Sequence, residues 1–138
     1  MMKRAAQELI VEYKHDLGKF FFYPNIVVGE FYKGVHVTKE SSKELIQFIK
    51  RVYEDKTPFV YISHRLHAYS MDLIESREVV KMFPNFIGFA VVSQNKYRRM
   101  IVSLEKIFVV KPIDVFYELE SAFIWAEERI EENIRQNT

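Results

Sequence analysis

The hydrophobic pattern begins with two β-rich runs near the N-terminus. Residues 19–23 and 26–32 are rich in Phe, Tyr, Ile and Val, and Pro24-Asn25 separates them. Proline fixes φ and asparagine tolerates turn geometry, so this pair suits a tight reversal. The pattern predicts an antiparallel hairpin that ends at Lys33-Gly34. Residues 1–15 carry apolar side chains at a loose helical spacing, which indicates an N-terminal arm or a short helix.

Helical and strand-like segments alternate after the hairpin. Apolar residues at helical spacing over 45–53 predict an amphipathic helix, and Ser41 and Glu44, after Thr38, have the spacing of a capping box at its start. Residues 59–62 form an apolar run without alternation, which is typical of a strand covered on both faces. We therefore expect this strand at the centre of a parallel sheet.

The alternation continues through the second half of the chain. A second helix is predicted from about 71 to 83, and a second buried strand over 86–92 follows it. Polar cap-type residues at 93–95 precede a third predicted helix, whose apolar face runs to Phe108. Residues 108–110 and 113–115 can form a last strand, and Pro112 between them favours the edge of a sheet.

The last helix is predicted from about 117 to 135. Leu119, Phe123, Ala126 and Ile130 form its inward stripe, and it carries six glutamates against two arginines. No repeat or linker divides the chain, so we expect one domain over residues 1–138. Its fold class is α/β, with a mixed sheet that combines an N-terminal antiparallel hairpin and parallel central strands.

Composition narrows the function classes. The chain has 138 residues, 20 Lys plus Arg against 19 Asp plus Glu, and no cysteine. Near-neutrality argues against a nucleic-acid partner, and the missing thiols exclude disulfides and Cys-ligated zinc. The four glycines form neither a phosphate loop nor a dinucleotide fingerprint, and no serine has the flanking glycines of a nucleophile elbow. We expect no cofactor and no catalytic site.

No signal for export or membrane insertion is expected. Polar residues interrupt the start of the chain, so it reads as part of the mature protein. The longest apolar runs, 20–23 and 86–92, are far shorter than the roughly 20 residues of a transmembrane segment. The expected location is cytoplasmic.

Polar residues gather after the two buried strands. Because the carboxyl ends of parallel strands meet at one sheet edge, we expect the loops 63–70 and 93–99 to converge there and to form an electropositive rim. Such a rim would suit a carboxylate, a phosphate headgroup or an acidic partner. The candidate residues for binding a ligand or partner are Ser63, His64, Arg65, His67, Tyr69, Ser70, Ser93, Lys96, Arg98 and Arg99.

Several of these candidates have simpler interpretations. His64 and His67 could be metal ligands, but no third ligand is apparent, so we expect no metal site. Arg65 could hold a carboxylate or could anchor its own loop. Ser70 could be modified or could be the N-cap of the second helix. Lys96, Arg98 and Arg99 could be solvated residues opposite an apolar helix face.

Certain strings resemble the STAS-like family, which is related to the anti-sigma-factor antagonists such as stage II sporulation protein AA. The resemblance runs from about Phe21 to Arg129, and its most specific parts are residues 34–38, 58–65, 88–93, 116–122 and 125–126. It implies about four helices packed mainly on one face of the sheet, frequent dimerisation and kinship with lipid-carrier domains of the CRAL-TRIO type. The family's regulatory members place a phosphorylatable serine after an aspartate, whereas here Tyr69 precedes the nearest serine, Ser70.

Three functions follow as hypotheses. The first is a non-enzymatic regulatory or protein-interaction module, and the resemblance implies that it is a homodimer. The second is a binder of a small anionic amphiphile, such as a fatty acid or a phospholipid-like molecule, in which aromatic side chains of the hairpin hold the apolar part. The third is a hydrolase-type enzyme with His64 or His67 as general base.

Overall fold

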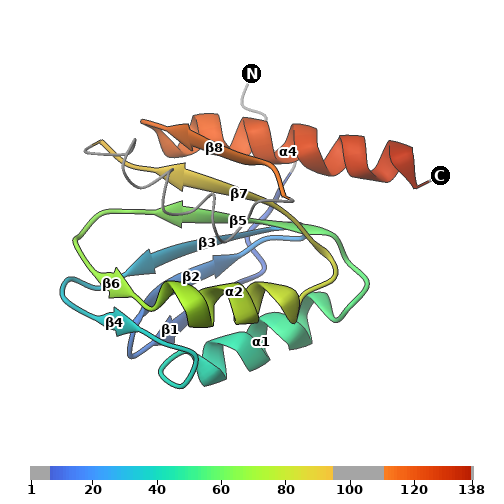
Figure 1. Ribbon diagram of the computed structural model, residues 1–138. Coiled ribbons are helices and arrows are strands. Elements are labelled where there is room, and N and C mark those ends of the chain that lie inside the picture. The colour runs from blue at the N-terminus through green and yellow to red at the C-terminus, as the bar shows by residue number, and fades with distance from the viewer. Residues whose placement is uncertain (1–6, 95–110, 138) are drawn as a thin grey trace.

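A six-stranded mixed sheet forms the centre of the structure (Figure 1), a computed structural model that describes residues 7–94 and 111–137. Its first three strands are β1 (Val11–His15), β2 (Gly18–Phe22) and β3 (Ile26–Phe31), and each pairs antiparallel with the next. The predicted hairpin is therefore confirmed as β2–β3. The expectation of a helix or arm over residues 1–15 is wrong for 11–15, because this segment alternates polar and apolar side chains and forms a strand.

The other three strands of this sheet run parallel to β3. They are β5 (Phe59–His64), β7 (Phe86–Val92) and β8 (Ile113–Phe116), in the spatial order β1-β2-β3-β5-β7-β8. The apolar runs are thus central strands and the segment after Pro112 is an edge strand, both as predicted. Two short strands, β4 (His36–Val37) and β6 (Ser70–Met71), form a separate parallel pair.

Helices cover both faces of the sheet (Figure 1). Helices α1 (Lys43–Tyr53) and α2 (Leu73–Lys81) pack on one face, and α4 (Leu119–Gln136) packs on the other. The expectation of about four helices mainly on one face is therefore corrected for the described residues, which contain three helices in a two-to-one arrangement. The third predicted helix lies in residues 95–110, outside the described residues.

Two hydrophobic clusters hold these layers together. Alternate residues of the central strands supply the two clusters, because successive side chains of a strand point to opposite faces. Phe20, Phe22 and Phe59 pack with α1, whereas Val60 and Ile62 pack with α4. The stripe predicted for α4 is confirmed, with Phe123, Ala126 and Ile130 buried and Leu119 packed against them.

The two predicted helix starts differ from the structure. Ser42, and not Ser41, precedes α1, and its hydroxyl donates to the Thr38 carbonyl at 2.6 Å. Glu44 instead bonds to His15, so the capping box does not form. Asp72, and not Ser70, caps α2 by accepting from the Glu75 backbone N–H at 3.0 Å. In both places the residue that precedes the helix lies one or two positions later than predicted.

Candidate ligand-binding site

The carboxyl ends of β5 and β7 meet, as the sequence predicts. The Arg65 backbone N–H donates to the Val92 carbonyl at 2.9 Å, and the Ser93 N–H donates to the Phe116 carbonyl at 3.0 Å. Ser93 is buried at this junction. Lys96, Arg98 and Arg99 lie outside the described residues, so the predicted electropositive rim is described only for its first loop.

The candidate residues of that first loop separate onto two faces of the sheet. Ser63 lies on the α1/α2 face, where its hydroxyl is 3.3 Å from the Tyr69 hydroxyl, and the Arg65 guanidinium lies 4.2 Å from the centre of the Tyr69 ring. His64 follows Ser63 in the same strand and therefore points to the opposite face. There its Nδ1 is 2.9 Å from a carboxylate oxygen of Glu30 in β3.

The remaining two candidates lie at the surface. His67 is exposed in the loop between β5 and β6. The Ser70 hydroxyl is 2.7 Å from His36 Nδ1, and this contact joins β6 to β4 beside their parallel backbone pairing. Ser70 thus connects two strands, and the predicted cap role belongs to Asp72.

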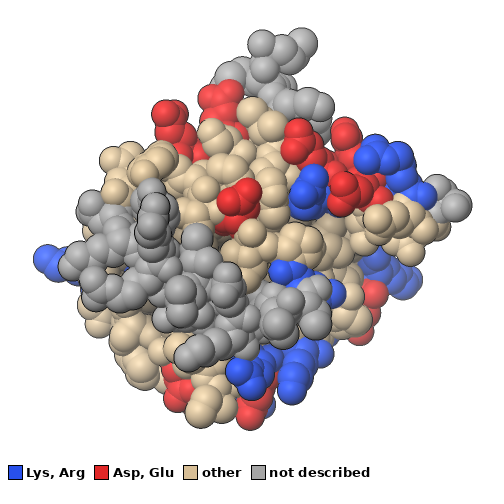
Figure 2. All heavy atoms as spheres, turned by 45° about the horizontal axis from the view of Figure 1, so that its top comes forward, with Lys and Arg blue, Asp and Glu red and all other residues tan. Residues whose placement is uncertain are grey.

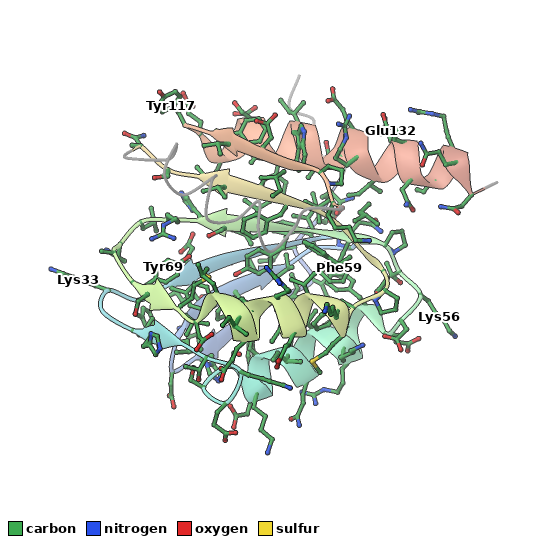
Figure 3. All side chains as sticks on the ribbon, in the orientation of Figure 1. Lys33, Lys56, Phe59, Tyr69, Tyr117 and Glu132 are labelled. Atoms are coloured by element: carbon green, nitrogen blue, oxygen red, sulfur yellow. The ribbon has the colours of Figure 1, made fainter. Side chains whose placement is uncertain are left out.

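An apolar cavity of about 150 Å³ lies between the sheet and helices α1 and α2. The sheet contributes Phe31, Phe59, Tyr61 and Phe89, and the helices contribute the aliphatic side chains of Ile49 and Val80 among others. Figure 3 shows Tyr69 and Phe59 near opposite ends of α2, and both of these residues line the cavity. An apolar cavity of this volume can hold a molecule of about the size of benzene.

One end of the cavity carries hydroxyl groups. Tyr61 and Ser63 lie two residues apart in β5 and so share the face that meets the cavity, where Tyr69 joins them. Gly29 in β3 makes room for the Tyr61 hydroxyl, because a Cβ atom at position 29 would collide with it. Burial raises the pKa of Tyr61 well above its ordinary value, and the nearby Tyr69 adds to this effect, so Tyr61 stays protonated at neutral pH.

Tyr69 separates this hydroxyl end from Arg65. Its ring packs 4.8 Å from the ring of Phe31 and also carries the Arg65 guanidinium. Within residues 7–94 and 111–137, Arg65 forms no ion pair with a carboxylate. A negative charge at the hydroxyl end of the cavity would therefore lie one ring away from a cation that has no acidic partner in this part of the chain.

Two other hydroxyl groups that line the cavity, those of Ser42 and Ser76, are already used within the protein. Ser42 donates to the Thr38 carbonyl, and Ser76 donates to the Asp72 carbonyl at 2.9 Å. Lys39 also lines the cavity, with its ammonium 3.6 Å from a carboxylate oxygen of Glu78. The polar groups suited to a ligand are accordingly those at the Tyr61, Ser63 and Tyr69 end.

Charged side chains are distributed unevenly over the surface. Figure 2 shows acidic groups spread over the face that α4 occupies, with a few basic groups among them. Glu127 departs from the expectation of a solvated acidic helix face, because it is buried. In the described ranges no group of three or more His, Asp or Glu side chains could hold a metal ion, and none of the helices there is long and apolar enough to cross a membrane.

Sequence reasoning identifies the hydroxyl end of the site but only part of its walls. It names Ser63, Arg65 and Tyr69, and it includes Phe31 among the hairpin aromatics that could hold an apolar ligand, whereas it places Tyr61 and Phe89 only in buried strands. The period of two along β5 places Tyr61 on the face of Ser63, and this signal could have identified Tyr61. No pattern in the sequence shows that α1 and α2 leave a space above the sheet.

The likeness of this chain to known proteins lies in the fold. No protein-family model and no curated protein matches the sequence. Among solved structures, the chain is similar to an uncharacterised protein of the DUF3478 family with a SpoIIAA-like fold, from Shewanella loihica PV-4. That likeness has a TM-score of 0.50 at 12% identity, and it covers 87% of this chain and 94% of the other. The predicted STAS-like resemblance is therefore confirmed at the level of the fold, which is SpoIIAA-like.

Proposed function

We propose that this protein is a non-enzymatic binding module whose ligand is a small anionic amphiphile. The observation that carries the proposal is the cavity between the sheet and helices α1 and α2, which is apolar along its length and has hydroxyl groups at one end. An apolar body would occupy the space beside Phe59 and Phe89. A carboxylate or similar head would accept hydrogen bonds from Ser63 and Tyr69, with the charge of Arg65 nearby.

The size of the cavity limits the ligand. A volume of about 150 Å³ suits a single ring or a short branched chain. We therefore narrow the sequence-based hypothesis of a fatty acid or phospholipid-like molecule to a small aromatic or short-chain carboxylate.

A binding role is favoured over catalysis by the positions of the histidines. His64 pairs with Glu30 on the face opposite Ser63, and His67 is exposed in its loop. The Ser70 hydroxyl does meet an imidazole, that of His36, but both side chains are exposed and neither lines the cavity. A general base in the cavity would have to be a residue other than these three histidines.

The experiment is a calorimetric titration with benzoate and with benzyl alcohol, a neutral analogue of similar shape. We expect benzoate to bind at one site per chain and more tightly than the alcohol. In Arg65→Gln the affinity for benzoate should fall by on the order of tenfold, because a nearby charge is lost, while the affinity for benzyl alcohol should not change.

The control is Lys33→Gln, which removes a cation from the exposed turn after β3 and should leave both affinities unchanged. The proposal is wrong if neither compound binds and if solvent extraction of the purified protein yields no small carboxylate by mass spectrometry. The part of the proposal that concerns the anionic head is wrong if Arg65→Gln lowers the affinities for both compounds equally.

A protein-interaction role is the second candidate, and exposed apolar side chains favour it. Leu66 in the loop after β5 is 53% exposed, and Ile74 at the start of α2 is 76% exposed. Side chains of this kind are common in contact surfaces. If they bind a partner, Leu66→Ser and Ile74→Ser should each abolish recovery of that partner from a native lysate, while Ile134→Ser on α4 should not.

A further inference from the structure

Strand β1 leaves one long edge of the main sheet open within the described residues. It is the outermost strand, and β2 is its neighbour on the inner side (Figure 1). Open edges present unpaired N–H and C=O groups and can pair with another strand. Glu12 and Lys14 are exposed on β1, and among residues 7–94 and 111–137 neither forms an ion pair.

The backbone groups that face this edge can be assigned from the ladder. The Tyr23 N–H donates to the Ile26 carbonyl at 2.8 Å, so by alternation Phe22 and Phe20 direct their backbone groups to β1. The Phe22 carbonyl accepts from the Ile10 N–H at 2.7 Å, so this carbonyl does face the β1 side of β2. Phe22 and Phe20 are opposite Val11 and Tyr13. The backbone groups of Glu12 and Lys14 therefore point outward.

These two residues are complementary to themselves. When two copies of β1 pair antiparallel about a two-fold axis at Tyr13, Glu12 of each copy is opposite Lys14 of the other. The same two residues hold the outward backbone groups, so each opposed pair can also exchange two backbone hydrogen bonds. Shifting the register by two residues would bring Glu12 opposite Glu12 or Lys14 opposite Lys14. Repulsion between like charges would destabilise both of these registers.

The other side of β1 carries partly buried apolar surface beside the same edge. The Tyr13 ring stacks on Phe48 of α1 with 4.1 Å between the ring centres, and both side chains are half-buried. Val11 is half-buried on the same side of the strand. A second β1 at this edge would place its own Tyr13 next to this surface and cover it further.

We infer that the chain forms a homodimer in which two β1 strands join the sheets of both copies into one continuous sheet. Charged side chains on an edge strand commonly prevent pairing, and a strand with charges of one sign would repel its own copy. Here the two signs alternate on a single face, and antiparallel pairing brings opposite signs together. The partner that fits this edge is therefore a second copy of this chain.

The main test is a charge exchange followed by sedimentation equilibrium. The wild-type protein should be dimeric at about 0.1 mM, well above the Kd of a micromolar homodimer. Lys14→Glu and Glu12→Lys should each raise the dissociation constant by on the order of tenfold or more, because the two-fold axis counts each change twice. The combined variant Glu12→Lys/Lys14→Glu restores opposite charges in both pairs and should recover the dimer.

A cysteine substitution provides an independent readout because the chain has no cysteine of its own. At a two-fold axis, Tyr13 of one copy would face Tyr13 of the other in a non-hydrogen-bonded pair, with Cα atoms about 4.5 Å apart, which is within disulfide range. Mild oxidation should therefore link Tyr13→Cys into a covalent dimer, and the control Tyr32→Cys, which has an exposed side chain after β3, should not be linked.

Thermal melts of each variant would confirm that it folds, and Glu12 and Lys14 are exposed positions where substitution should not unfold the protein. A monomeric wild-type protein at this concentration would overturn the inference. A combined charge variant that dimerises no better than the single variants would overturn it too, even if Tyr13→Cys does not fold.

Discussion

The side-chain directions of individual residues determine which candidate groups lie on the same face of the sheet. Ser63 and His64 are adjacent in sequence, yet they point to opposite faces. The Ser63 hydroxyl contacts Tyr69 on the α1/α2 face, and the His64 ring contacts Glu30 on the α4 face. Strand alternation thus divides a cluster that looks continuous in the sequence. At the same scale, Gly29 matters because its missing Cβ leaves space for the Tyr61 hydroxyl at the cavity.

Tyr53 illustrates how one side chain ties a helix to the sheet. It is 1% exposed at the end of α1, and its hydroxyl donates to the Tyr23 carbonyl at 2.6 Å and lies 2.9 Å from the Ile26 carbonyl. Tyr53→Phe should lower the free energy of unfolding by about 0.5–1.5 kcal/mol, because the hydrogen bond from this buried hydroxyl to the backbone is lost. Denaturant unfolding measures this loss, and Tyr32→Phe, at an exposed position, is the control with no expected change.

The same residue predicts a pH dependence. Burial raises the pKa of Tyr53 above its ordinary value. A raised pKa in the folded state contributes stability that is complete below the unfolded pKa and is lost as pH rises. The free energy of unfolding should therefore fall above about pH 10. The free energy of unfolding of Tyr53→Phe should fall less over that range, so its difference from the wild-type value should narrow. A gap that is constant with pH would contradict this account.

At the scale of elements, the central strands and long helices follow from the sequence, whereas the edges do not. The apolar runs that became β5 and β7 have no alternation because helices cover both of their faces. β1 was missed, although residues 11–15 alternate apolar and polar side chains, because a few apolar residues before it suggested a helix. The predicted capping box of Ser41 and Glu44 does not form, because the Glu44 carboxylate bonds to His15. This partner is 29 positions away, and no local pattern reveals it.

This His15–Glu44 contact joins the end of β1 to the start of α1. His15 Nδ1 accepts from the Leu17 N–H at 3.1 Å, so Nε2 can donate to the Glu44 carboxylate, also at 3.1 Å. The hydrogen bond from His15 lowers the pKa of Glu44 below its ordinary value. A lowered pKa contributes stability above the unfolded pKa, and this stability is lost as pH falls through the folded pKa.

Glu44→Gln should therefore lower the melting temperature slightly at neutral pH, and the difference from wild type should disappear as pH falls below about 4. Melting curves across this range measure the effect, with the exposed Glu40→Gln in the preceding turn as control. A difference that persists or grows in acid would show that the Glu44 carboxylate is not the group responsible.

At the scale of the whole molecule, the cavity is a property of packing and not of any one segment. Its walls come from β3, β5 and β7 below and from α1 and α2 above. No side chain of α2 is buried, so this helix covers the sheet without filling the space beneath it. Whether two layers leave such a volume depends on side-chain sizes and helix placement together, and sequence periodicity reports neither.

The most direct test of the central claim, that the cavity takes a small anionic ligand, is to fill it. Val80 lines the cavity from α2, and Val80→Phe adds a ring to that wall, whereas Ile74→Phe places the same ring at an exposed position of the same helix. Calorimetric titration with benzoate should show one site per chain in the wild type and in Ile74→Phe, and no binding in a folded Val80→Phe. Equal binding by all three proteins would contradict the account.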